Sequence, residues 1–425
     1  IVHHEGITSG TDLASGTKKY QAVNRDKFLE RWKDRLPHFP NPVVDPENRA
    51  EIRRARDHHL KGRILIIDAY TPEPDQDSGS LRLVYLMKCM RELGYGVTFM
   101  PDNQAFAGEY TKDLQKIGIE AVYNPWIQSL QKFFSERGPE FDFVMVLRHY
   151  VASKYLGLVR RHCPDARFLF DTVDLHYLRE ERMAELEDSL PLKRTAAQTR
   201  RSELAVINGS DATLVVSPVE KTVLEEAAPE ARVHVISNVH EVTGSKKPWS
   251  ERKDLFFVGG YQHPPNIDAA QWFVGSIWPL IREQLPGVEF HLIGSKATDV
   301  VRALDGNGVR FQGFVESMEP WLDNCRLAVA PLRYGAGIKG KVNMSMSHGQ
   351  PVVATPMAVE GMFAKHGRDV LVAETAEEFA AEVVRVYQDE ELWNLVSASG
   401  QENVNRYFSV ETARLGLQEL LNALS

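Results

Sequence analysis

Residues 63–68 of the chain are Arg63-Ile64-Leu65-Ile66-Ile67-Asp68, an apolar run that lacks the polar alternation of a half-exposed strand. Such a run is typical of a strand that is buried on both faces, as in parallel sheets covered by helices. A proline-containing loop follows, and apolar residues then recur with helical spacing from 81 to 93 and stop at Gly94. The stretch therefore predicts the first strand, loop and helix of an α/β sheet.

The same alternation continues along the chain. It predicts further strands of this sheet at 96–100, 120–123, 143–147, 167–170, 212–216 and 233–236. After a polar break at 243–248 it resumes, with strands at 255–260, 289–293, 309–312, 327–331, 351–355 and 370–373 and a last helix at 410–424. Strands that alternate with helices indicate doubly wound α/β sheets. We therefore expect two Rossmann-like domains, 61–245 and 246–425, which face each other across a cleft at the carboxyl ends of their strands.

Residues 1–60 do not share this pattern. They are polar, contain a cluster of prolines between 37 and 46, and have too few apolar residues for a core of their own. The chain also opens on Ile1 rather than Met. We expect this segment to be an extension or the tail of a missing upstream domain.

The composition is that of an ordinary globular protein, with 43% hydrophobic and 25% charged residues. The net charge of −8 gives no basic excess for nucleic acid or an anionic membrane. Cys89, Cys163 and Cys325 are far apart in apolar surroundings, which predicts buried free thiols in a reducing compartment. No apolar run approaches the roughly 18 residues that span a bilayer. We expect a cytoplasmic protein, with peripheral attachment to the inner membrane face as the alternative.

An apolar stretch contains Trp126, Phe133 and Phe134 at helical spacing. The spacing favours packing in the core over an exposed face for an acceptor or a membrane.

The segment 333–341 carries the clearest chemical signal. Glycines such as Gly335 and Gly337 allow the backbone to approach a ligand, and Arg333 lies beside them. Lys339 and Lys341 fall at the start of a predicted helix over 342–348, where the helix dipole disfavours cations. A bound diphosphate would reverse that penalty. The alternative is a flexible glycine turn with two exposed lysines.

The loop after the first strand contains Asp75, Asp77, Ser78, Gly79 and Ser80. Either serine can cap the helix that follows, and the glycine allows close approach of a substrate. The two aspartates have the Asp-x-Asp spacing that holds a divalent metal in another sugar-transferase fold, but turn and cap roles explain both of them. We therefore predict no metal site, and we assign residues 77–80 to an acceptor-side loop of the cleft.

Three polar side chains, Asp171, Asp174 and His176, follow the strand at 167–170. At this edge of a sheet they are expected to point into the cleft, where acid–base or hydroxyl-binding groups are useful. Asp174 and His176, together with Lys341, are the candidate catalytic residues. A structural role for the histidine is the alternative.

A second glycine loop follows the first strand of the second domain and contains Gly259, Gly260, His263 and Asn266. Its placement matches that of the first-domain loop, so we expect the two loops to face each other. Glu360 follows the strand at 351–355 and brings one carboxylate to the same edge. These residues complete the predicted donor side of the cleft.

Together these motifs resemble glycosyltransferase family 4 of the GT-B fold, and most closely its bacterial surface-polysaccharide and O-antigen branch. The segments that carry the resemblance are 74–80, 171–176, 335–341, 349–355 and 359–362. The resemblance implies transfer of a sugar, with rhamnose as one candidate, from a nucleoside-diphosphate donor on the second domain to a glycan or lipid-linked glycan on the first. It also implies retention of configuration, no metal or other cofactor, and a last helix that crosses back to the first domain.

The sequence departs from the family at two positions. Ala336 and Met344 stand where many members carry a pair of glutamates that hold sugar and ribose hydroxyls, and Glu360 is a candidate substitute. Two rival functions stay open for this reason: a non-transferring GT-B enzyme such as a nucleotide-sugar epimerase, and a sugar-binding pseudo-enzyme. Residues 3–32 resemble the end of family-2 transferases, which implies an upstream glycosyltransferase domain of the GT-A fold.

Overall fold

The computed structural model describes residues 19–36, 39, 45 and 47–425. The chain divides into two compact units, Ile1–Gly62 and Arg63–Ser425. The first unit contains helices α1 (Lys19–Trp32) and α2 (Arg49–Arg56), and none of its described residues belongs to a hydrophobic core. The prolines between 37 and 46 and much of the family-2-like segment lie outside the described residues.

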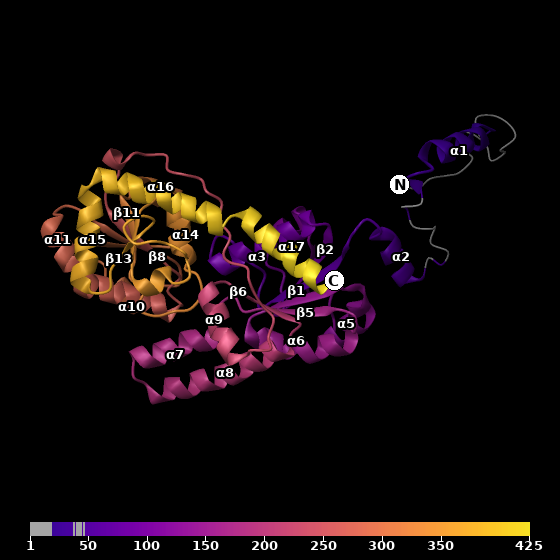
Figure 1. Cartoon of the computed structure of the whole chain (residues 1–425), viewed down its shortest axis with the longest axis horizontal. Helices are drawn as coiled ribbons and strands as arrows, with labels where there is room; N and C mark the ends of the chain where they lie inside the picture. Colours follow the sequence, from indigo (N-terminus) through magenta and orange to yellow (C-terminus); the bar gives the residue numbers. More distant parts are fainter. Residues whose placement is uncertain (1–18, 37–38, 40–44, 46) are drawn as a thin grey trace. The chain divides into compact units, whose positions relative to one another are not determined.

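The second unit contains two parallel sheets (Figure 1). The first sheet has seven strands in the order β3-β2-β1-β4-β5-β6-β7. Their bounds are β1 Gly62–Asp68, β2 Tyr95–Pro101, β3 Glu120–Ala121, β4 Phe143–Leu147, β5 Arg167–Asp171, β6 Ala212–Val215 and β7 Val233–Val235. The order reverses beside β1, which creates a ligand-binding crevice at the carboxyl ends of the strands.

The second sheet has six strands in the order β10-β9-β8-β11-β12-β13. Their bounds are β8 Leu255–Val258, β9 Phe290–Ile293, β10 Val309–Gly313, β11 Leu327–Ala330, β12 Val352–Ala354 and β13 Leu371–Val372. The order reverses beside β8, so both sheets share one topological plan. The predicted doubly wound, two-sheet α/β architecture is therefore confirmed. We call β1–β7 with α3–α9 the first lobe, and β8–β13 with α10–α16 the second lobe.

Helices connect the strands in both lobes. Those of the first lobe are α3 (Ser78–Glu92), α4 (Glu109–Lys116), α5 (Leu130–Arg137), α6 (His149–His162), α7 (His176–Leu186), α8 (Leu190–Gly209) and α9 (Pro218–Ala227). Those of the second lobe are α10 (Pro264–Trp272), α11 (Trp278–Gln284), α12 (Asp299–Arg302), α13 (Glu319–Asn324), α14 (Gly340–Ser347), α15 (Ala376–Gln388) and α16 (Glu390–Tyr407). Helices α7 and α8 form a hairpin between β5 and β6 (Figure 1).

The last helix, α17 (Val410–Leu424), packs on the first lobe although it follows the second (Figure 1). Its buried residues Leu417 and Leu420 join the same hydrophobic cluster as Leu83 and Leu86 of α3. Arg167 of β5 donates a hydrogen bond to the carbonyl oxygen of Leu424 at 3.1 Å. The end of the chain thereby ties the two lobes together.

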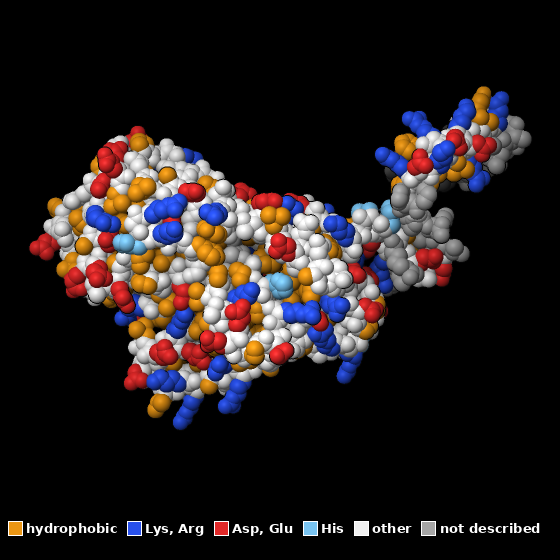
Figure 2. All heavy atoms as spheres, in the orientation of Figure 1, with side chains coloured by type: hydrophobic (Ala, Val, Ile, Leu, Met, Phe, Trp, Pro, Cys, Tyr) orange, Lys and Arg blue, Asp and Glu red, His pale blue; other side chains and the backbone are white. Residues whose placement is uncertain are grey.

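The first sheet is buried on both faces, as the run at 63–68 predicts. Ile64 and Ile66 belong to the cluster on one face, whereas Leu65 and Ile67 belong to the cluster on the other. The three cysteines are buried free thiols, as predicted. Across the described residues, no helix has the length and apolarity needed to cross a membrane. Figure 2 shows acidic and basic side chains interspersed over the face that it presents.

The prediction for the stretch at 126–134 is only partly correct. Phe133 and Phe134 of α5 are buried in the core, but the side chain of Trp126 is exposed. Trp126 lies in the loop between β3 and α5, outside the helix whose periodicity was used to place it. A residue that precedes the helix does not share its buried face.

Candidate functional site

Loops of the two lobes meet at the carboxyl ends of their sheets. Gly340, the first residue of α14, approaches Ser78, the first residue of α3, so closely that a Cβ atom on Gly340 would lie 2.3 Å from the Ser78 Cβ. A Cβ on Gly337, whose φ is 66°, would lie 3.1 Å from the Asp174 Cβ. Both positions therefore require glycine, and the loop 333–341 is brought against the acceptor-side residues.

Lys341 lies in the first turn of α14 and is partly buried. Its Nζ donates a hydrogen bond to the Asn266 Oδ1 and lies 4.3 Å from the centre of the Phe257 ring. Burial, followed by the nearby charge of Lys339, lowers the pKa of Lys341 to about 7. The ammonium is thus held in place without a neutralising carboxylate.

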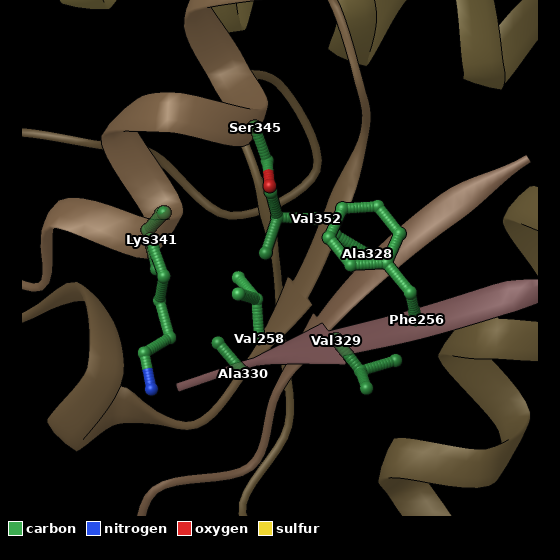
Figure 3. Close-up of a pocket in the computed structure, with 9 residues that line it drawn as sticks. Phe256, Val258, Ala328, Val329, Ala330, Lys341, Ser345 and Val352 are labelled. Carbon is green, nitrogen blue, oxygen red and sulfur yellow. The ribbon is translucent and has the colours of Figure 1, made fainter. Parts of the chain in front are cut away.

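Figure 3 shows the surroundings of Lys341, a small pocket beneath α14 that has no room for a water molecule. Its walls are apolar side chains of β8, β11 and β12, together with Lys341 and Ser345 of the helix. Sites for small ligands usually enclose roughly 300–1,000 Å³. The pocket is therefore not a complete donor site. Its apolar walls explain why the Lys341 side chain is shielded from water.

Lys339 is the residue that precedes α14, and it is also partly buried. Its Nζ donates to the carbonyl oxygens of Ala336 at 3.0 Å and Gly337 at 2.6 Å. Burial lowers the pKa of Lys339 to about 8, although the charge of Glu360 acts in the opposite direction. Among the described residues, neither this lysine nor Lys341 forms an ion pair with a carboxylate.

The glycine loop after β8 joins the same group. The Nδ2 of Asn266 donates to the carbonyl oxygen of Gly260 at 2.9 Å, and a Cβ on Gly259 would lie 2.8 Å from the Asn266 Cγ. His263 precedes α10, and burial lowers its pKa, with the charges of Arg179 and Lys341 adding to the effect. The structure therefore brings four of the predicted donor residues next to Lys341.

Arg333 and Glu360 are engaged elsewhere. Arg333 binds the carboxylate of Asp268 in α10, with its Nε at 2.9 Å from the Oδ2. Glu360 accepts two hydrogen bonds from Arg182 of α7, at 2.7 and 2.8 Å. Arg182 also donates to the carbonyl oxygen of Gly335 at 2.7 Å. In this structure Glu360 bridges the lobes, so its oxygens are not free to replace the absent glutamate pair.

The expectation that all three polar side chains after β5 point into the cleft is wrong for Asp171. This carboxylate is fully buried and forms an ion pair with the Nη1 of Arg82 in α3 at 2.7 Å. Its Oδ1 accepts from the amide of Val173 at 3.0 Å. Asp171 still belongs to the regular strand, and the chain turns only after it, where Val173 has a φ of 63°.

Asp174 and His176 follow that turn and come together. The Nδ1 of His176 lies 3.0 Å from the carbonyl oxygen of Asp174 and 3.4 Å from its Oδ1, and Arg179 of α7 binds the other carboxylate oxygen. Burial raises the pKa of Asp174, but the charges of Arg179 and His176 outweigh it and hold that pKa below its usual value. Burial lowers the pKa of His176. A neutral imidazole beside an ionised carboxylate can accept a proton from a hydroxyl.

Sequence reasoning missed several groups that build this site. The ring of His149 stacks on His176 with centroids 5.0 Å apart, and burial lowers its pKa to about 4. Glu203 of α8 accepts from the amides of His176 and Tyr177, and burial raises its pKa to about 8. Arg148, whose φ is 66°, binds Asp68 at 2.8 Å. The position of Arg148 and His149 directly after the buried strand β4 could have indicated them, whereas no such signal marks Glu203 within α8.

Asp77 and Asp75 have protein partners of their own. Asp77 caps α3: its Oδ1 accepts from the amide of Ser80, and its Oδ2 from the Ser80 hydroxyl, both at 2.8 Å. Asp75 accepts from the Tyr110 hydroxyl at 3.0 Å. The cap role predicted for the aspartates therefore holds for Asp77, which caps α3 in place of Ser78 or Ser80, whereas Asp75 binds a side chain of α4.

We therefore expect Asp77→Asn to preserve both stability and activity, because asparagine caps helices as well as aspartate does. Thermal unfolding and the rate of sugar transfer would check this, with Asp77→Ala as the comparison that loses about 0.5–2 kcal/mol of stability. If Asp77 instead holds a metal, Asp77→Asn would lose its activity, and EDTA would abolish the activity of the wild type.

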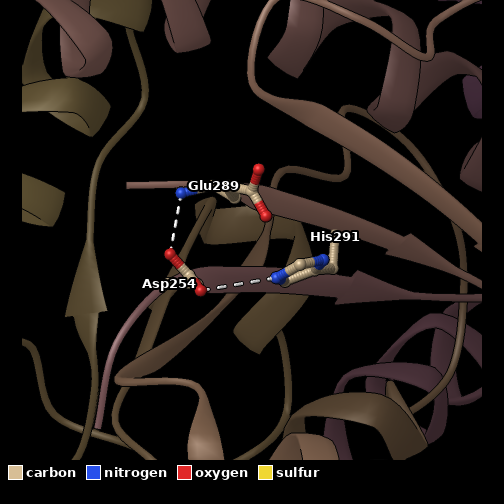
Figure 4. Close-up of side chains that lie close together, drawn as sticks. All are labelled: Asp254, Glu289 and His291. Atoms are coloured by element: carbon tan, nitrogen blue, oxygen red, sulfur yellow. Dashed lines mark hydrogen bonds and ion pairs between the residues drawn. The ribbon is translucent and has the colours of Figure 1, made fainter. Parts of the chain in front are cut away.

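A cluster at the opposite edge of the second sheet was not predicted. Asp254, Glu289 and His291 bring ligand atoms within 4.8 Å of one another (Figure 4). Each already has a protein partner: Arg310 binds the Glu289 carboxylate at 2.7 Å, Gln312 contacts the His291 Nδ1 at 3.1 Å, and the Glu289 amide donates to Asp254 at 2.8 Å. The cluster is satisfied by these contacts.

Comparisons with known proteins agree with this architecture. Residues 252–389 match the family model described as glycosyl transferases group 1. An uncharacterized 44.6 kDa protein of the cps region of Klebsiella pneumoniae is 23% identical over 140 residues, which cover 31% of this chain and 36% of that protein. The match thus spans about a third of the length of this curated relative.

Solved structures match most of the chain. Anabaena HepE in complex with UDP and glucose has a TM-score of 0.67 and 15% identity, covering 85% of this chain and 100% of HepE. Sucrose-phosphate synthase from Thermosynechococcus elongatus has a TM-score of 0.65 and 14% identity, covering 86% and 99% of the two chains. A glycosyltransferase from Rickettsia africae has a TM-score of 0.62 and 13% identity, covering 86% and 98%.

The chain therefore has the GT-B fold. Residues 252–389, in the second lobe, match the model of the group 1 glycosyl transferases, and the sequence motifs resemble the same class of enzyme. The narrower assignment to family 4 stays a prediction.

Proposed function

We propose that this protein transfers a sugar from a nucleoside diphosphate to a hydroxyl of a bacterial surface glycan. The observation that supports the proposal is the pair of partly buried lysines at the start of α14. Ammonium groups that are shielded from water without a carboxylate partner are costly, and the positive end of a helix increases that cost. A diphosphate bound between Lys339 and Lys341 and the first amides of α14 would offset both charges.

The chemistry follows from this placement. Negative charge grows on the departing diphosphate, so fixed ammonium and amide groups stabilise the transition state. Asp174 and His176 lie on the first lobe across from Gly337, where an acceptor hydroxyl would be presented. Two relatives support the substrate classes: HepE binds UDP and glucose, and the Klebsiella protein comes from a cps region. Rhamnose as the sugar, a glycan or lipid-linked glycan as the acceptor, retention of configuration and independence from metal belong to the proposal through the family resemblance.

A panel of nucleotide sugars, screened by thermal shift and then assayed for transfer, tests this function. Transfer that requires an added acceptor would support it. Turnover of the donor without an acceptor would favour an epimerase. Donor binding with no turnover would favour a pseudo-enzyme. This rival remains because Ala336 and Met344 replace the glutamate pair and because Glu360 is bound to Arg182.

Donor binding should take up protons in mildly alkaline solution. The pKa of Lys341 is lowered to about 7 by burial, so this lysine is mostly neutral at a pH near 8 in the free protein. A bound diphosphate favours the ammonium form and raises that pKa, so a proton enters with the donor and affinity falls as the pH rises. Calorimetry of UDP-glucose binding in buffers of different ionisation enthalpy measures this uptake, because the esterified diphosphate does not titrate near neutral pH. An uptake that is unchanged in Lys341→Met would contradict the assignment.

A further inference from the structure

Four aromatic side chains of the first lobe are exposed along one edge of its sheet. Tyr70 follows β1, Phe106 follows β2, Trp126 follows β3 and Tyr150 follows β4, and their exposed fractions are 65%, 48%, 75% and 51%. These strands are neighbours in the order β3-β2-β1-β4. No other Phe, Tyr or Trp in the first lobe, all of which the structure describes, is exposed to this degree. We call these four residues the aromatic row.

The loops that carry the aromatic row are joined to one another. The amide of Asp102, after β2, donates to the carbonyl oxygen of Asp68 at 2.7 Å. The amide of Asn124, after β3, donates to the carbonyl oxygen of Gln104 at 3.0 Å. The loops that carry Tyr70, Phe106 and Trp126 therefore lie next to one another at this edge of the sheet.

The aromatic row leads to the candidate catalytic residues. The Tyr150 ring lies 6.1 Å from the His176 ring, and His176 in turn contacts Asp174 at 3.0 Å. Neighbouring strands lie about 4.8 Å apart, so the four steps from β3 to β5 cover roughly 19 Å. The surface is long and narrow, and it ends where an acceptor hydroxyl would react.

The basic groups beside the aromatic row are paired with carboxylates: Arg148 with Asp68 at 2.8 Å and Lys154 with Asp102 at 2.6 Å. Asn103, Asn124 and Asp75 are exposed. An anionic membrane would need basic side chains here. Aromatic faces next to amides and carboxylates suit a chain of sugars, whose apolar ring faces can stack while the hydroxyls form hydrogen bonds.

We propose that Tyr70, Phe106, Trp126 and Tyr150 bind an oligosaccharide acceptor several units long, so that the protein extends an existing glycan instead of glycosylating a single sugar. This inference rests on the proposed function, since it takes the row as the acceptor side of the site. It also gives a reason why Trp126 is exposed although its apolar neighbours in α5 are buried.

The test measures retention of the full chain on an array of bacterial surface oligosaccharides that increase in length from monosaccharides upward. We expect the wild type to bind the longer glycans best. Trp126→Ala and Tyr70→Ala should each bind them about tenfold more weakly, a change of about 1.4 kcal/mol, with weak monosaccharide binding unchanged. Leu395→Ala is the matched control, because Leu395 of α16 is 50% exposed on the second lobe, and it should behave as wild type.

Calorimetry with the panel of nucleotide sugars on the same proteins separates this inference from the proposed function. If the wild type binds none of these nucleotide sugars, the proposed function is refuted, whereas the array still reports on the aromatic row. Two array results would overturn the inference: no glycan retained by the wild type, or equal retention by Trp126→Ala. Binding to neutral phosphatidylcholine vesicles that Trp126→Ala abolishes would also overturn it, in favour of a membrane surface.

Discussion

Replacing Lys341 with alanine should lower kcat by about 10²–10³, which corresponds to roughly 2.7–4 kcal/mol of transition-state stabilisation. The ammonium is held by Asn266 and the Phe257 ring at the start of α14, so it is positioned before the donor binds. Because negative charge grows on the diphosphate as its bond to the sugar breaks, loss of the ammonium should affect kcat more than the binding of the acceptor. Steady-state kinetics with the donor identified by thermal shift would measure the effect.

Two variants make this experiment decisive. Lys341→Met keeps the apolar stem that packs in the pocket of Figure 3 and removes only the charge, so it should be as slow as the alanine variant while unfolding at the wild-type temperature. Lys365→Ala removes an exposed lysine of the same lobe and should retain full activity. If kcat of Lys341→Met stays within about threefold of wild type, the loss is well below the tenfold change that 1.4 kcal/mol represents. That result would assign both lysines a structural role.

Local patterns in the sequence are sufficient to predict the fold. Most strands of both sheets are short apolar runs between polar or glycine-rich segments, because strands covered on both faces cannot alternate. The exceptions are β3, which has two residues, and β10, which alternates. The position of Lys339 and Lys341 at the start of a helix could also be predicted locally, because they end a glycine-rich loop that follows a buried strand. Such local features predict the edge of the sheet at which a site lies.

The contacts that complete the site join distant segments, and the sequence pattern does not contain them. Arg182 of α7 and Glu360 are bound to each other across the lobes although 178 positions separate them. Glu203 of α8 reaches back to the amide of His176. Neither pairing follows from helical periodicity, because a charged residue on a helix looks the same whether it faces solvent or another helix.

The opposite roles of Asp171 and Asp174 show a second limit of prediction from the sequence. Both residues follow the same apolar run, so the pattern predicts the same position for both. The backbone separates them at Val173, whose positive φ is a conformation that β-branched residues rarely adopt. One carboxylate is thereby directed into the core toward α3, and the other toward Gly337 and the donor loop. No residue type in the segment indicates that turn.

Replacing Arg82 with methionine should therefore destabilise the first lobe by about 3–5 kcal/mol, because it leaves the buried charge of Asp171 without its partner. Arg82 is 1% exposed, and it binds Asp171 at 2.7 Å and the carbonyl oxygen of Ile236 at 2.7 Å. It thus joins α3, β5 and the chain after β7. Urea denaturation would measure the loss, and Lys112→Met is the control, since its exposed pair with Glu109 should contribute no more than about 1 kcal/mol.

The double variant Arg82→Met/Asp171→Asn separates the charge from the packing. If the unpaired carboxylate causes the loss, neutralising it should recover part of the stability, while the amide of Val173 keeps an oxygen to donate to. The double variant should also transfer sugar more slowly than wild type. Without Arg82, only the hydrogen bond from the Val173 amide to residue 171 would hold the turn that places Asp174 and His176. A single variant Arg82→Met that loses less than about 1 kcal/mol, or a double variant no more stable than Arg82→Met, would show that the buried pair does not stabilise this turn.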